Sequence, residues 1–113
     1  MGIKVLKDFQ KGDAIVVRLE FEGSNNLTNN TFNITLSASL NATPAYDQNF
    51  TANTNLHADD DLVNGIINLT MRTTNIPPGN YLYSIIRTVA GDITTIARSG
   101  LNSVDTVECK KQL

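Results

Sequence analysis

The sequence predicts a single all-β sandwich domain of about seven antiparallel strands, spanning residues 1–113. In several segments apolar and polar residues alternate with a period of two, which is the pattern of half-buried strands. Glycine, proline and asparagine recur between these segments, as turns between short strands require. No segment carries the 3.6-residue apolar period of a helix over three turns, so little helix is expected.

The first two clear strands are expected at residues 15–22 and 31–40. In residues 15–22 the odd positions are aliphatic or aromatic, while the even positions after Val16 are charged. In residues 31–40 the even positions are apolar and the odd positions are Thr, Asn or Ser. The polar stretch 23–30 between them is longer than a tight hairpin turn, as sandwich connections often are.

The second half of the chain supplies the remaining strands. Residues 41–64 have the weakest pattern, and we expect loops there around one short strand near residues 48–53. Alternation returns at residues 65–72, and the two prolines and the glycine within residues 74–79 end that strand. Further strands are expected at residues 81–89, 93–98, 104–108 and 3–7, the first two of these forming an antiparallel hairpin.

The strand at residues 81–89 is apolar on both of its sides, which bears on assembly. Tyr81, Tyr83 and Ile85 lie on one side, and only one side can face the core of this domain. The other side either forms an interface with another molecule, joined by residues of neighbouring strands, or is covered by the segment 41–64. The candidate interface residues are Leu82, Ile86, Val16 and Ile96.

Composition excludes several classes of partner and location. The net charge of −2 provides no excess of Lys and Arg for binding the phosphates of nucleic acid. The chain has neither a signal-like apolar start nor a run of about eighteen apolar residues that could span a bilayer. We therefore expect a soluble protein made in a cytoplasm. Cys109 is the only cysteine and is interpreted as an incidental thiol.

His57 and the acidic run 59–61 are the one candidate for chemistry, as an acid–base pair or a metal site. Calcium is the better of these two readings, because it takes several oxygen ligands from a loop. The Asp-x-Asp-x-Asp-Gly spacing of calcium loops is absent, however, and a solvated acidic loop explains the run more simply. Calcium binding stays open, and we expect neither enzymatic activity nor a cofactor.

The three tyrosines could in principle stack on sugar rings, as aromatic residues do in carbohydrate-binding sandwiches. There is no Trp, and Tyr81 and Tyr83 lie on the side of their strand that is expected to be buried. Tyr46 is therefore the residue on which a carbohydrate-binding reading depends.

Several features occur in a characteristic order from residue 11 to about residue 107. Residues 11–13 open an alternating strand, residues 65–69 begin a later one, residues 78–85 read Pro-Gly-Asn-Tyr-Leu-Tyr-Ser-Ile, Gly91 lies in a hairpin, and residues 99–101 lead to a last strand. This order resembles the immunoglobulin-like β-sandwich at the N-terminus of phage upper-baseplate and fibre-attachment proteins, also found as small phage virion proteins. The resemblance is one of pattern rather than of a sharp signature.

The resemblance implies that Tyr81 forms a tyrosine corner, whose hydroxyl ties the start of its strand to nearby backbone. It also implies a scaffolding role without catalytic residues. The chain departs from the family in two places. The aspartate-leucine-threonine phrase common after the first strand is reduced to residues 26–28, and no fibre or receptor-binding region follows.

The leading expectation is thus a bacteriophage virion structural protein, placed in the tail, baseplate or neck or attaching a fibre. A capsid decoration protein and a carbohydrate-binding adhesion module are the alternatives. We expect the chain to be made in the host cytoplasm and located in the virion. Its expected partners are other virion proteins and copies of itself, arranged as a symmetric homo-oligomer or repeated on the particle, without nucleic acid or membrane.

Overall fold

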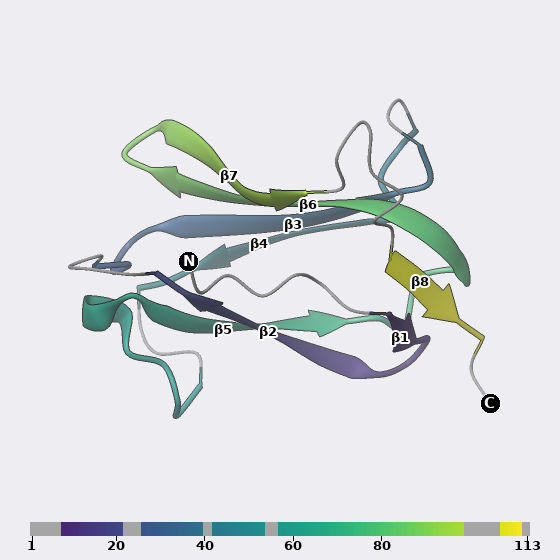
Figure 1. Cartoon of the computed structure of the whole chain (residues 1–113), viewed down its shortest axis with the longest axis horizontal. Coiled ribbons are helices and arrows are strands. Elements are labelled where there is room, and N and C mark those ends of the chain that lie inside the picture. Colours follow the sequence, from purple (N-terminus) through teal and green to yellow (C-terminus); the bar gives the residue numbers. More distant parts are fainter. Residues whose placement is uncertain (1–7, 22–25, 40–41, 54–56, 99–106, 112–113) are drawn as a thin grey trace.

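Two β-sheets face each other across one hydrophobic core (Figure 1). The computed structural model describes residues 8–21, 26–39, 42–53, 57–98 and 107–111, with the backbone alone at residues 96–98. The strands are β1 (Phe9–Gln10), β2 (Ala14–Glu20), β3 (Thr31–Ser37), β4 (Tyr46–Thr51), β5 (Ile66–Arg72), β6 (Gly79–Val89), β7 (Asp92–Arg98) and β8 (Val107–Lys110). Within this described part, the short 3-10 turn η1 (Leu62–Asn64) is the only helical element. The all-β class is confirmed.

The larger sheet has the strand order β1-β8-β6-β3-β4, and β7 also pairs with β6. The smaller sheet consists of β2 and β5, paired antiparallel. The long strand β6 pairs with β8 through residues 79–81 and with β7 through residues 84–89. Pairing between β1 and β8 is parallel, so the larger sheet is mixed and the expectation of purely antiparallel strands was wrong. Parallel neighbours need a long connection, and here almost the whole domain lies between the two strands.

Each strand expected between residues 15 and 98 is present, with ends shifted by up to three residues. The last strand is described from Val107 to Lys110, and residues 104–106 of the expected strand lie outside the described residues. The two-residue strand β1 was not expected, because so short a segment has no periodicity to detect. The strand expected at residues 3–7 lies outside the described residues.

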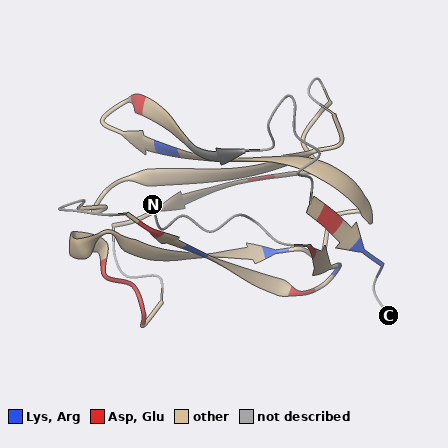
Figure 2. Cartoon of the chain, viewed as in Figure 1, with Lys and Arg blue, Asp and Glu red and all other residues tan. Residues whose placement is uncertain are grey.

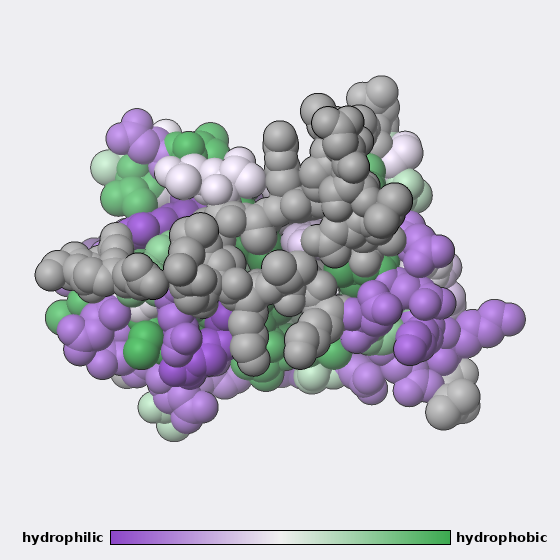
Figure 3. Space-filling view, in the orientation of Figure 1, coloured by the Kyte–Doolittle hydropathy of each residue, from purple (hydrophilic) through white to green (hydrophobic). Residues whose placement is uncertain are grey.

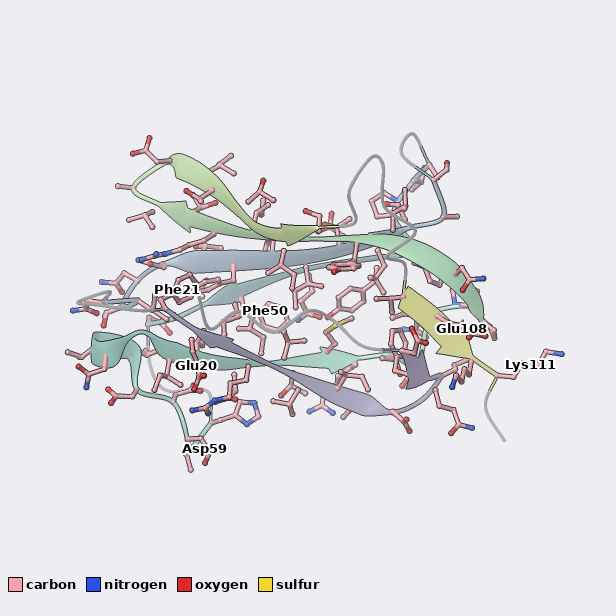
Figure 4. All side chains as sticks on the ribbon, in the orientation of Figure 1. Glu20, Phe21, Phe50, Asp59, Glu108 and Lys111 are labelled. Atoms are coloured by element: carbon pink, nitrogen blue, oxygen red, sulfur yellow. The ribbon has the colours of Figure 1, made fainter. Side chains whose placement is uncertain are left out.

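The inward rows of the two sheets form the core, as the alternation predicted. On β3 and β5 every apolar residue of the inward row is fully buried. Phe50, from β4, lies between the two layers in Figure 4. The largest fully buried side chains on these rows are Leu19, Phe32, Ile34, Leu36, Ile67, Leu69, Met71 and Ile85.

Tyr81 forms the corner that was expected from the resemblance. Its ring is buried at the start of β6, and its hydroxyl donates a hydrogen bond to the carbonyl oxygen of Pro77, four residues earlier. Burial raises the pKa of the Tyr81 hydroxyl, which keeps it protonated as a donor. The bond fixes the chain where it enters β6 after the two prolines.

Polar side chains close both ends of the sandwich. At one end the fully buried Thr73 accepts a hydrogen bond from the Gly12 amide at 2.9 Å and donates one to the Asp13 carbonyl at 2.6 Å. This ties the turn before β2 to the segment after β5. At the other end the Arg87 guanidinium lies 4.9 Å from the centre of the Phe21 ring, a cation–π contact that covers the core.

Candidate interaction surface

The outer face of the larger sheet carries Leu82 and Ile86, the two residues that define the predicted interface. Both side chains are half-buried on the outward row of β6, while Tyr81, Tyr83 and Ile85 point into the core. The predicted division of β6 into two apolar sides is therefore correct. The outward rows of β3, β4 and β6, called the outer face below, consist of Thr31, Asn33, Thr35, Ser37, Asp47, Asn49, Thr51, Asn80, Leu82, Ser84, Ile86 and Thr88.

Hydroxyl and amide groups dominate the outer face, and Asp47 is its only charged residue. The strands of the larger sheet are accordingly mostly tan in Figure 2. The side-chain amide of Asn33 donates to Asp47 Oδ1 at 2.6 Å and to Asn49 Oδ1 at 3.0 Å. Thr35 Oγ1 donates to Asn33 Oδ1 at 2.6 Å. These lateral bonds hold the polar side chains in place across two strands.

Leu82 and Ile86 lie apart within this polar surface. Leu82 is opposite Ser37 on β3, and Ile86 lies between Asn33 on β3 and Thr95 on β7. Four residues along a strand separate them by about 13 Å. On β3, β4 and β6 the face therefore presents two separate apolar points among uncharged polar residues, and the exposed Ile93 on β7, opposite Thr88, adds a third on the same side of the sheet.

Val16 does not extend this face in the way that was predicted, and the place of the Ile96 side chain stays a prediction. Val16 is 53% exposed, but it lies on β2, which pairs with β5 in the opposite sheet, so its placement on a strand neighbouring β6 was wrong. Alternation along one strand does not show which strands pair. Ile96 lies at a register shift between β7 and β6, and its side chain is outside the described residues.

The alternative was that the segment 41–64 covers this side of β6, and residues 46–51 and 57–61 of that segment do not. Strand β4 lies beside β3 and widens the larger sheet. Residues 57–61, called the edge segment below, lie instead against β5 of the smaller sheet. In Figure 3 pale and green residues gather at the upper left, over the β6–β7 hairpin, and purple ones at the end near the C-terminus.

The edge segment contains the predicted candidates for chemistry, and the structure gives them structural partners. Asp60 is buried; its Oδ1 accepts hydrogen bonds from the amide and the side-chain amide of Asn68, each at 2.8 Å, and its Oδ2 accepts one from the His57 amide at 3.0 Å. His57 Nε2 lies 2.6 Å from Thr70 Oγ1. Asp61 accepts a bond from Asn64.

This arrangement favours neither the acid–base nor the calcium reading. The carboxylate of Asp60 faces three N–H donors, whereas a cation would need its oxygens to be directed at the metal. Asp59 is exposed at the tip of the loop in Figure 4. Within the ranges that the structure describes, no group of three or more His, Cys, Asp or Glu side chains is arranged to hold a metal ion.

The remaining predicted candidates are also built into the core. Burial raises the pKa of the Cys109 thiol, although Lys11 partly opposes this, so the thiol stays protonated and weakly nucleophilic. Tyr46 packs against the core, its hydroxyl donates to Gln48 at 3.1 Å, and burial raises its pKa to about 12. All four Phe and three Tyr side chains are described, and each is buried or half-buried, so the surface offers no exposed aromatic platform for a sugar.

The comparisons with known proteins add no relative: no family model, no curated protein and no solved structure matches this chain. Within the described residues, no helix has the length and apolar character needed to cross a membrane.

Proposed function

We propose that this protein is a structural component of a bacteriophage virion, an immunoglobulin-like module that attaches within a tail, baseplate or neck through its outer face. The sequence pattern from residue 11 to about 107 supports the virion assignment by resemblance. The strand order and the Tyr81 corner support the immunoglobulin-like part of the proposal. In the variable type of that fold the sheet that contains the last two strands is the larger one, as the sheet containing β7, β6, β3 and β4 is larger than β2-β5 here.

The observation that carries the attachment role is the near absence of charge on the outer face. Protein interfaces are depleted of charged residues at their centre and keep polar groups at the rim. Twelve outward positions on β3, β4 and β6 include one charged residue, Asp47, and its carboxylate is already bonded to Asn33. Leu82 and Ile86 supply apolar contacts, and ordered hydroxyl and amide groups supply hydrogen bonds around them.

The first test is quantitative mass spectrometry of purified particles from the source phage or induced prophage. A few to a few dozen copies per particle are expected for a tail, baseplate or neck component. A copy number near that of the major capsid protein, or a simple fraction of it, would favour decoration of the head instead. Absence from the particles would contradict the virion proposal.

The second test locates the attachment surface. Leu82→Lys and Ile86→Lys should leave the domain folded, because both side chains are only half-buried, and should lower the number of copies incorporated into particles. Val16→Lys, which changes an exposed aliphatic residue on the opposite sheet, is the matched control and should leave incorporation unchanged. If Val16→Lys alone lowers incorporation, attachment occurs through the smaller sheet. If Leu82→Lys and Ile86→Lys both unfold the domain, the residues belong to the core.

A further inference from the structure

Among the described residues, β5 ends the smaller sheet, and its free edge is closed by the edge segment rather than by another strand. At Ile66 the closure uses backbone: Asp61 and Ile66 exchange two N–H to carbonyl hydrogen bonds, each 2.9 Å long. At Asn68 it uses a side chain, because the Asp60 carboxylate accepts the backbone N–H that the carbonyl of a neighbouring strand would accept. At Thr70 the hydroxyl lies 2.6 Å from His57. The edge segment thus contacts three alternate residues of β5, which are Ile66, Asn68 and Thr70.

The sequence of β5 explains why an open edge here would matter. Residues 66–71 read Ile-Ile-Asn-Leu-Thr-Met, with neither charge nor proline nor glycine. Segments of this kind pair readily with copies of themselves when their backbone groups are free. Neither of the usual protections, a charged side chain or a proline within the strand, occurs before Arg72.

We infer that the edge segment is an autoinhibitory contact, in which Asp60 blocks the addition of a second copy of β5 to the edge of the smaller sheet. The inference does not depend on the proposed function. Asp60 takes the place of a strand. It accepts the backbone N–H of Asn68, which points away from β2, and it also binds the Asn68 side chain. The edge segment thereby covers Asn68, which is 4% exposed although it lies on the outward row of its strand.

The test replaces Asp60 in the full chain and follows both the Asn68 amide and the mass of the protein. Asp60→Ala should remain folded, should speed hydrogen exchange at the Asn68 amide by roughly tenfold or more, and should give a concentration-dependent mass above that of the wild type in light scattering. Asp47→Ala is the matched control, because it removes the carboxylate that binds Asn33 on the outer face. It should change neither exchange at Asn68 nor mass.

A double variant shows whether the added mass comes from β5. Asp60→Ala combined with Asn68→Pro removes the backbone N–H of residue 68, which a second copy of β5 would need. The double variant should have the wild-type mass. Proline is tolerated at this position because the N–H of residue 68 points away from the partner strand β2. Asp60→Asn is the milder form of the test in case Asp60→Ala does not fold. Three results would each overturn the inference. The first is unchanged exchange at the Asn68 amide when Asp60 is replaced, and the second is an unchanged mass in both Asp60→Ala and Asp60→Asn. The third is added mass that persists in the double variant.

Discussion

Strands β3 and β5 carry the same local pattern but lie in different surroundings. Residues 32–36 read Phe-Asn-Ile-Thr-Leu and residues 67–71 read Ile-Asn-Leu-Thr-Met. In both strands the apolar residues fill the core, and the Asn side chain donates a hydrogen bond to an aspartate, Asp47 for Asn33 and Asp60 for Asn68. Asn33 is half-buried on an open sheet face, whereas Asn68 is buried beneath the edge segment.

The difference shows that the contribution of a polar contact to the free energy of unfolding depends on whether the contact is covered. On the outer face, water can replace a lost hydrogen bond, so the Asn33 network costs little to remove. Beneath the edge segment, a lost partner leaves donors or acceptors without water, and the full desolvation penalty applies. The two strands therefore provide matched pairs of substitutions.

The largest difference is expected for the two asparagines. Asn68→Ala should lower the free energy of unfolding by about 2 kcal/mol, because the buried Asp60 carboxylate then loses the hydrogen bond from the Asn68 side chain. Asn33→Ala should lower it by less than about 1 kcal/mol. Denaturant unfolding of both variants against the wild type measures the two values. Equal losses would show that the edge segment does not shield Asn68 from water.

A smaller difference is expected for the two threonines. Thr70→Val removes the hydroxyl that pairs with His57 and should lower the free energy of unfolding by about 1 kcal/mol. Thr35→Val should be close to neutral, because its hydroxyl bonds Asn33 on the open face and Val suits a strand equally well. The same unfolding measurement applies, with Ser84→Ala on the outer face as a control for lost hydroxyl groups. A neutral Thr70→Val would mean that His57 does not anchor the edge segment.

The smallest effect needs no substitution, because the two asparagines can be compared within the wild-type protein. Hydrogen exchange of the side-chain amide protons should be slower for Asn68 than for Asn33, because Asn68 is covered and Asn33 faces solvent. Side-chain NMR spectra of the labelled protein measure both in one sample. Faster exchange at Asn68 would indicate that the edge segment opens often in solution.

Much of the fold followed from the sequence because period-two alternation is a local property. The strands from β2 to β7, the inward rows and the hairpin of β6 and β7 were all predicted from it. The parallel pairing of β1 with β8 was not predicted, because it joins residues about a hundred positions apart. For the same reason the alternation of β2 could not show that Val16 lies on the opposite sheet from Ile86.

For the candidate surface, the sequence identified Leu82 and Ile86 as the outward apolar residues of β6, but not their neighbours. The hydrogen bonds among Asn33, Asp47 and Asn49 depend on the register of β3 with β4, which a weak pattern in residues 41–64 could not supply. Asp60 was identified as a candidate for chemistry because it stands beside His57. Its role at the β5 edge had no sequence signal, since an aspartate in a loop is normally solvated.

The sequence by itself determined the all-β class, the positions of most strands and the side of each strand that faces the core. These follow from how apolar side chains must alternate when one side of a strand meets water. Only the tertiary structure decided which strands pair, which polar side chains are covered and which stay open. Asn33 and Asn68 differ for this reason alone: the burial of a side chain depends on what the rest of the chain places above it, and no local pattern contains that information.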